Sequence, residues 1–321
     1  MKEHKGVMAA LAEARKERRC AYGTSPSLRR ALNRRAAEGT LVSPLNNIYM
    51  PKETWHGLDS CERSQHIVRA LACLHPNWVF AGLTAACMHG FDHSWTAHDG
   101  AIRIADLYQS GRVSGQPIER VYMQEIPIDR VDGITVTDQA RTVIDCGLFL
   151  PFEHALGIID SALRQGLDTA RVLEQCAHLR TNHEAVLHLI EHADARSENG
   201  GESLTRGTIL TLGFARPELQ VEFTDPNDLR QTYRVDFLWR LHDGRIIVLE
   251  FDGTRKYVDP QMTGARTVRQ VVNDQIERDR ILKEAGVTTV VHCFHNEVIA
   301  RQPLYDKLRD AGVPWVGCPF N

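Results

Sequence analysis

The sequence has 321 residues, of which 43% are hydrophobic and 25% are charged, and its net charge is −3. This is the composition of an ordinary globular protein of two or three domains, and the charge argues against a wholly basic nucleic-acid binder. No apolar run is as long as a membrane helix, so we expect no membrane span and no membrane partner. Eight cysteines without a CxxC pair indicate reduced thiols in a cytoplasmic protein, and neither a disulfide framework nor a cysteine zinc site.

Charge is unevenly distributed along the chain. Residues 1–40 hold ten Lys and Arg and four Glu, a net charge of +6, which leaves −9 for the remaining residues. A basic segment on an acidic body suits contact with a phosphate backbone. A solvated helical surface would have the same composition, so charge alone leaves both interpretations open.

Residues 27–50, "SLRRALNRRAAEGTLVSPLNNIYM", predict a helix that stops at Gly39 and a short hairpin around a Pro/Asn turn. The apolar stripe of this helix consists of Leu28, Ala31, Leu32 and Ala36. The candidate DNA-binding residues on its other faces are Arg29, Arg30, Arg34 and Arg35. A basic helix followed by a hairpin is what a winged helix-turn-helix needs, so residues 1–60 are predicted to be such a domain. A helix and a hairpin without a DNA role would have the same pattern.

Residues 61–192 predict a mixed α/β domain. Residues 61–91 indicate two helices separated at "HPN", and residues 101–145 contain short strand-like runs. Amphipathic helices are predicted at "FEHALGIIDSALRQG" and at residues 183–193. We find no catalytic constellation in this part of the sequence.

The polar stretch 193–201, "ADARSENGG", predicts the boundary of a third domain that extends to residue 321. A helix, "ESLTRGTILTLGF", follows it, with Glu202 and Arg206 four residues apart on one face. Next come the strands "LQVEF", "YRVDFLW" and "IIVLEFDG", the helix "VRQVVNDQIERDRILKEAG" and the strand "VTTVVHCF". This order predicts a small α/β sheet.

Three acids stand at two of these strands: Asp236 on one, Glu250 and Asp252 on the next. The turn "HDGR" predicts that the two strands pair, and the period of two places Glu250 and Asp252 on one face. Carboxylates brought together repel unless they take up protons or bind a cation. Mg²⁺ or Mn²⁺ would relieve that repulsion, could activate water for attack on a phosphodiester, and accepts substrate oxygens as ligands.

Positive charge from Lys256, Arg255 or Arg278 could then stabilise the transition state. The structural alternative has Asp236 exposed at a strand end, Glu250 paired with Arg278, and Asp252 in ordinary turn chemistry. An acid inside "IIVLEF" favours function, because charges are rarely placed in a buried strand without a partner or a metal.

Residues 196–299 resemble the very-short-patch-repair-like endonuclease domains of the PD-(D/E)xK superfamily. The resemblance lies in the ordered motifs "ESLTR", "GFARPELQ", "VDFLW", "VLEFDG" and "DQIERDRILKEAG". It implies a restriction-endonuclease-like sheet with Asp236 and Glu250 as metal ligands and Glu202 as the helical acid of the site. The supporting positions that it implies are Arg206, Gln220, Asp274 and Arg278.

The sequence departs from the superfamily pattern at the usual lysine, where Asp252 stands. The branch that it resembles also has aspartate there, usually with a histidine a few residues later. Here "TRKY" occupies that place, so Lys256 is expected to act where the histidine would. Asp252 and Lys256 would orient water or stabilise charge.

The front of the chain resembles the winged helix and following domain of AbiEi-type antitoxins, through "EGTLVSPLNNIYM", "WVFAGLTAACMHGF" and "ITVTDQARTVIDC". This implies DNA as a partner, a protein partner in a phage-defence or toxin–antitoxin setting, and a homodimer on paired half-sites. Two functions follow: a metal-dependent DNA endonuclease, or an antitoxin-like transcriptional regulator with an inactive nuclease-like domain.

Overall fold

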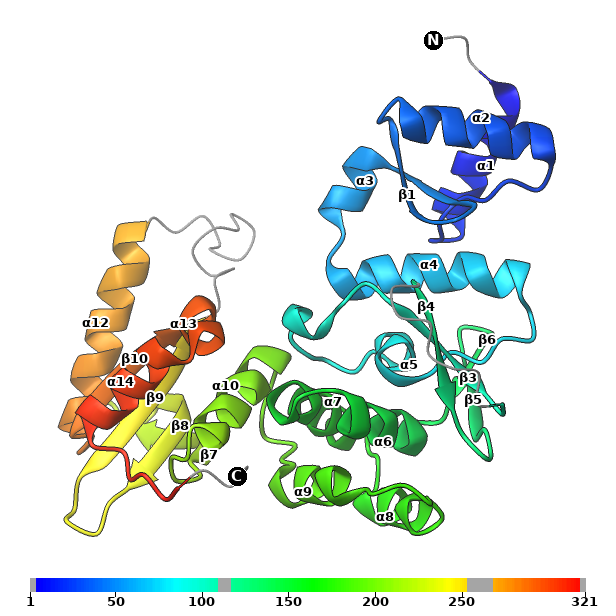
Figure 1. Ribbon diagram of the computed structural model, residues 1–321. Helices are drawn as coiled ribbons and strands as arrows, with labels where there is room; N and C mark the ends of the chain where they lie inside the picture. Colours follow the sequence, from blue (N-terminus) through cyan, green and yellow to red (C-terminus); the bar gives the residue numbers. More distant parts are fainter. Residues whose placement is uncertain (1–3, 109–116, 253–267, 318–321) are drawn as a thin grey trace. The chain divides into compact units, whose positions relative to one another are not determined.

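The computed structural model describes residues 4–108, 117–252 and 268–317, with the backbone alone for 268–274. The chain forms two compact units, each built from helices and strands as the predicted α/β class requires (Figure 1). The first unit comprises Met1–Phe91, Trp95–Phe149 and Leu167–Val186, and the second comprises Asp92–Ser94, Leu150–Gly166 and Leu187–Asn321. Among the described residues, no helix is long and apolar enough to cross a membrane.

The first unit begins with two helices and a hairpin: α1 (Lys5–Lys16), α2 (Pro26–Ala37), β1 (Leu41–Leu45) and β2 (Ile48–Pro51). Helix α2 starts where Ser25 Oγ accepts a hydrogen bond from Leu28 N at 3.2 Å and Pro26 fills the first turn. The hairpin turns at Asn47, whose φ of +61° suits the left-handed region that asparagine tolerates.

The predicted apolar stripe of α2 is confirmed. Ala31 and Leu32 are buried, and Leu28 and Ala36 pack against the same cluster together with Tyr49 of the hairpin. The Tyr49 hydroxyl also donates to Asn33 Oδ1 at 2.6 Å, which fastens the hairpin to the helix.

The rest of the first unit alternates helices and short strands. Its elements are α3 (Lys52–Gly57), α4 (Ser60–Leu74), α5 (Gly82–His89), η1 (Trp95–Ala97), β3 (Ile102–Asp106), β4 (Ile118–Tyr122), β5 (Ile128–Val131), β6 (Ile134–Thr137), α6 (Gln139–Phe149) and α8 (Thr169–Ala177). The predicted break at "HPN" is present between α4 and α5. Strands β3 and β4 are parallel, whereas β5 and β6 are antiparallel.

The strand-like pattern expected to continue to residue 145 is wrong after Thr137, because α6 begins at Gln139. Asp138 Oδ1 accepts a hydrogen bond from Arg141 N at 2.8 Å, as a helix N-cap does. The helix then pairs Arg141 Nε with Asp145 Oδ1 at 2.8 Å, four residues apart. Local capping therefore outweighs the β propensity of the valine and isoleucine that follow.

The second unit contains α7 (Phe152–Arg164), the end of α9 (Glu184–His192), α10 (Gly200–Thr211), β7 (Glu218–Thr224), β8 (Thr232–Arg240), β9 (Ile246–Asp252), α12 (Val268–Glu284), β10 (Thr289–Phe294), α13 (His295–Ala300) and α14 (Gln302–Ala311). The sheet order is β10-β9-β8-β7, with β10 parallel to β9 and the other pairs antiparallel. The predicted order of helix, two or three hairpin strands, helix and strand is present, with three strands before α12.

The two faces of this sheet are covered by different helices (Figure 1). Leu204 of α10 and Leu304 and Leu308 of α14 pack with Leu249 and Cys293 of the strands. On the other face, Leu282 of α12 packs with Val248. Consecutive residues of β9 thus point alternately at α10 and at α12.

Helices α7 and α10 pack so closely that glycine is required between them. A Cβ on Gly207 would lie 2.6 Å from Cα of Glu153 in α7. The same pair of helices buries an ion pair, in which Arg206 Nη2 lies 2.6 Å from Asp160 Oδ2 and both side chains are 0% exposed. The stretch 193–201, predicted to be a domain boundary, lies within this unit together with α7.

Candidate metal centre at the strand ends

In strands β7 and β8, the side chains on either side of Gln220 and Asp236 point to opposite faces of the sheet. Gln220 and Asp236 lie between the residue pairs Leu219–Phe237 and Val221–Val235. The pair Leu219 and Phe237 belongs to the cluster under α10, whereas Val221 and Val235 pack in the cluster under α12. In a regular strand, residues two apart share a face. The φ of Gln220 is +54°, a left-handed backbone that is uncommon for this residue type, and it accounts for the change in β7.

Asp236 therefore lies where the side chains of β8 change from one face of the sheet to the other. Its Oδ2 accepts a hydrogen bond from the backbone N of Phe251 at 2.9 Å, which ties it to the next strand. Burial and, after it, the negative charge of Asp236 raise the pKa of Glu202 on the α10 side and of Glu250 on the α12 side. Asp236 is thus near enough to act electrostatically on both glutamates, but among the described residues the oxygens of the three carboxylates do not gather within 4.8 Å of one another.

Glu250 is 8% exposed and points toward α12. Burial and the charge of Asp236 raise its pKa to about 7, although Arg278 opposes the rise. Arg278 Nη2 lies 2.8 Å from Glu250 Oε1. The Glu250–Arg278 ion pair, expected if these acids have a structural role only, is therefore present. The guanidinium does not offset the combined effect of burial and of Asp236, because the pKa of this carboxyl stays above its ordinary value.

Glu202 is 6% exposed in the first turn of α10. Burial, followed by the charge of Asp236, raises its pKa to about 7. Its Oε2 accepts hydrogen bonds from Glu198 N at 2.8 Å and Gln220 Nε2 at 2.9 Å, and its Oε1 accepts one from Asn199 Nδ2 at 2.6 Å. Gln220 was predicted to support the site, and its left-handed backbone directs its side-chain amide to the Glu202 carboxylate.

Asp252 belongs to a second polar group on the α12 side of the sheet. Its Oδ2 lies 3.2 Å from Nδ1 of His292 on β10, and His292 Nε2 lies 3.2 Å from Asp279 Oδ1 on α12. Gln275 Nε2 is also 2.9 Å from His292 Nδ1. The hydrogen bond to Asp252 is the main cause that raises the pKa of His292, which favours the imidazolium between two carboxylates.

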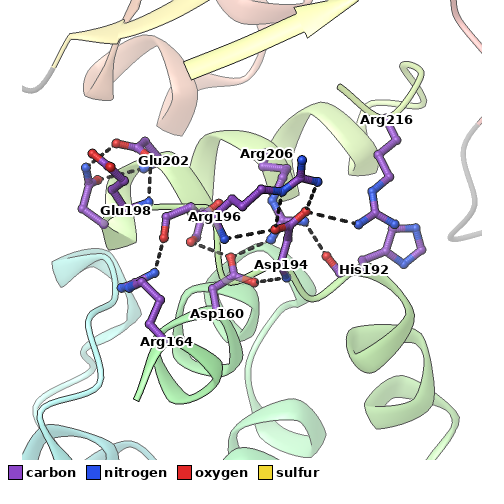
Figure 2. A network of polar contacts seen from close by, with 12 residues as sticks. Asp160, Arg164, His192, Asp194, Arg196, Glu198, Glu202, Arg206 and Arg216 are labelled. Carbon is purple, nitrogen blue, oxygen red and sulfur yellow. Dashed lines mark hydrogen bonds and ion pairs between the residues drawn. The ribbon is translucent and has the colours of Figure 1, made fainter. Parts of the chain in front are cut away.

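Figure 2 shows how the start of α10, and Glu202 with it, is held to α7. Asp160 Oδ1 accepts from Asp194 N at 2.8 Å, while its Oδ2 binds Ser203 and Arg206. Arg206 also donates to the carbonyl of His192. The segment that leads into α10 is thereby fixed by buried, charge-assisted hydrogen bonds.

The other predicted residues have different positions. Arg206, expected beside the site, is turned toward Asp160 and His192, so it supports the helix packing. Lys256 and the side chain of Asp274 lie outside the described residues.

Helix α2 presents the predicted basic residues at its surface. Arg29, Arg30 and Arg34 are exposed and Arg35 is half-buried. Arg30 Nε donates to Pro26 O at 3.3 Å and Arg35 Nη1 donates to Ala31 O at 3.2 Å, both within the helix. Arg29, Arg30 and Arg34 therefore lie at the surface of the folded helix.

Sequence reasoning did not select His292, Gln275 and Asp279. Gln275 and Asp279 lie one turn apart on α12, a polar helix in which glutamine and aspartate are common. His292 lies opposite Glu250 only because β10 pairs with β9 in this parallel register. A lone histidine in the strand "VTTVVHCF" was the available signal.

The ligand type suits a hard divalent cation, although the three carboxylates would have to move closer together to hold one ion. Three carboxylates on three elements supply oxygen ligands, and two of them have a pKa near 7 that a cation would lower again. No family model, curated protein or solved structure matches this chain. The resemblances to endonuclease domains and to antitoxins therefore stay predictions from the sequence.

Proposed function

We propose that the chain is a Mg²⁺- or Mn²⁺-dependent DNA endonuclease with a restriction-endonuclease-like sheet in its second unit. The observation that supports the proposal is that two buried acids, Glu202 and Glu250, flank Asp236, which is tied to β9 by the 2.9 Å hydrogen bond from Phe251 N. Burial, followed by the charge of Asp236, raises the pKa of both glutamates to about 7. The order of three antiparallel strands, a helix and a parallel fourth strand is a second observation that supports the proposal.

In this function Asp236, Glu250 and Glu202 bind the metal, which when bound lowers the pKa of a water and offsets charge on the phosphodiester. Gln220 holds Glu202 in position through its 2.9 Å hydrogen bond, and Arg278 keeps Glu250 oriented. Asp252 and His292, 3.2 Å apart, supply a hydrogen-bonded pair that can hold a proton beside the site. The basic face of α2, in a winged helix, locates DNA.

Plasmid cleavage tests the proposal. Wild type, Glu250→Gln and Asp236→Asn are incubated with supercoiled and single-stranded DNA in Mg²⁺ and in Mn²⁺. Asp243→Asn, an exposed acid in the turn between β8 and β9, is the matched control. Loss of a ligand should lower the rate at least about a hundredfold. Cleavage that survives in Glu250→Gln would exclude the carboxylate cluster as its source.

A second function, that of an antitoxin-like DNA-binding regulator with a protein partner, is favoured by one contact. Arg278 already pairs with Glu250 at 2.8 Å, and aspartate stands where the superfamily has its lysine. A protein that shifts DNA, cuts none of the substrates and shows no Mg²⁺ or Mn²⁺ binding by calorimetry would have this function.

DNA binding itself is tested through the charge on α2. Arg30→Glu and Arg34→Glu should each weaken a mobility shift and lower the slope of log K against log salt by about 0.9 per lost phosphate contact. Lys283→Glu, the same charge change at an exposed position of α12, is the control. Equal effects at both places would mean that net charge, and not α2, determines binding.

A further inference from the structure

Helix α9 carries a cluster of metal-ligating side chains that the carboxylate site does not use. His188, Glu191 and His192 stand three and four residues apart, so they share one helix face. One donor atom from each lies within 4.8 Å of the donor atoms of the other two. His188 Nδ1 is 3.8 Å from Glu191 Oε2.

The hydrogen bonding of His192 defines which of its nitrogens can bind a metal. Its Nδ1 lies 3.0 Å from the carbonyl oxygen of His188. Because a carbonyl only accepts, Nδ1 carries the hydrogen and the lone pair is on Nε2. Metal-binding histidines usually have this arrangement, in which the second nitrogen donates to a carbonyl and fixes the ring.

The two imidazoles are also held in place by packing. The ring centroid of Phe152 is 4.9 Å from that of His188 and 5.6 Å from that of His192. The nearby Arg216 is paired with Asp194 at 3.7 Å, which offsets its positive charge.

We propose that His188, Glu191 and His192 form a site for a borderline transition-metal ion such as Zn²⁺. Two imidazoles and one carboxylate are a donor set that Zn²⁺ takes, with a water in the fourth position, whereas Mg²⁺ prefers oxygen ligands throughout. Glu191 is 73% exposed, so its carboxylate is accessible to close on the ion. This site differs in chemistry from the carboxylate cluster and does not depend on the proposed nuclease function.

The ion would act as a clamp on the end of α9. The carbonyl of His192 accepts from Arg206, and Asp194 accepts from Arg196 and lies close to Arg216 (Figure 2). Binding would therefore stabilise the segment that enters α10. Free energy of binding to the folded state adds to its stability by mass action.

Calorimetric titration of the full-length protein with Zn²⁺, in excess Mg²⁺, tests the site. Wild type should bind one more equivalent of Zn²⁺ than His192→Ala, or bind it at least about tenfold more tightly. Glu191→Ala should also weaken binding, and because Glu191 is exposed its loss leaves the fold intact. Glu184→Ala, another exposed acid of α9, should bind as wild type does.

The metal environment separates this site from the thiols of the chain. Co²⁺ bound to His and Glu gives weak visible bands, whereas thiolate ligands add intense near-ultraviolet bands. Weak bands that are lost in His192→Ala, and a Zn²⁺-dependent rise in melting temperature lost with them, would support the site. Unchanged Zn²⁺ binding in both His192→Ala and Glu191→Ala, or thiolate bands alone, would overturn it.

Discussion

Asp236 affects the pKa of Glu202 and of Glu250 because of its position in β8. Gln220, with φ +54°, and Asp236 occupy the level at which β7 and β8 exchange faces. A left-handed glutamine costs of order 1 kcal/mol and persists only where its surroundings require it. Here it directs an amide to Glu202 at 2.9 Å, while Asp236 acts on acids of both faces. The strain is therefore located at the candidate site.

Proton uptake by the site should make stability depend on pH. Glu250 has an ordinary pKa of 4.5 and a folded value of about 7, so the folded state keeps a proton that the unfolded state releases. Its contribution is complete below pH 4.5 and is lost as the pH rises through 7. Without divalent ions, the free energy of unfolding should fall by about 3 kcal/mol between pH 5 and pH 8 on this account.

Urea unfolding in EDTA at several pH values measures this fall. The side chain at position 250 cannot titrate in Glu250→Gln, so its free energy of unfolding should fall less between pH 5 and pH 8, by about 3 kcal/mol. This difference does not depend on how much the loss of the ion pair with Arg278 changes the absolute stability. Glu222→Gln, at an exposed position of β7, should leave the fall unchanged. Mg²⁺ should flatten the wild-type curve if it binds the deprotonated cluster. An identical pH dependence in Glu250→Gln and wild type would contradict the raised pKa.

Single residues show what the sequence can predict about the site. Asp236, Glu250 and Glu202 could be selected because acids near apolar strands and in a first helical turn are conspicuous against their neighbours. Arg206 could be placed on a face but not given its partner, since Asp160 is 46 residues earlier. His292 was not selected because its meaning depends on the register of β10, which the strand itself does not encode.

Elements were predictable where periodicity and caps agree. Helix α2 has a serine cap, a first-turn proline and an apolar stripe, and strands β7, β8 and β9 of the second unit are separated by clear turns. Helix α6 was not predicted, because β-branched residues follow its aspartate cap. Helix α8 was not predicted either, and the pairing of β3 with β4 depends on contacts distant in sequence.

The packing of α7 on α10 gives a prediction at the scale of the element. Gly207→Ala should be favoured by helix propensity by about 1 kcal/mol. Its Cβ would, however, lie 2.6 Å from a backbone atom of Glu153, which cannot move without displacing α7. We expect a net loss of about 2 kcal/mol in the free energy of unfolding, because overpacking of this kind exceeds the propensity gain.

The matched control is Gly57→Ala at the end of α3, where a Cβ meets nothing within 4 Å. It should be neutral or slightly stabilising. Urea midpoints of both variants measure the difference. A stabilised Gly207→Ala protein would mean that α7 does not lie against α10 as the structure has it.

At the scale of the whole molecule, the limits of the second unit predict which fragments fold. The unit includes Leu150–Gly166 as well as Leu187–Asn321, so α7 belongs with the sheet although it precedes the polar stretch at 193–201. A fragment that begins at residue 193 keeps Arg206 but loses Asp160. Both side chains are 0% exposed, so the guanidinium would lose its buried partner. Removal of one partner of a buried pair costs about 3–5 kcal/mol.

We therefore expect fragment 150–321 to unfold cooperatively and fragment 193–321 to be less stable by at least about 3 kcal/mol, or to remain unfolded. Circular dichroism against urea concentration compares the two. Both fragments lack Asp92–Ser94, whose contacts include the 3.0 Å hydrogen bond from Gly200 N to the Asp92 carboxylate, so this loss does not affect the comparison. Asp160→Asn in fragment 150–321 isolates the charge, and it should lose part of the same stability with α7 still present. Equal stability of the two fragments would mean that α7 is not part of the fold of the second unit. The guanidinium of Arg206 would then bind water or another acceptor without loss of stability.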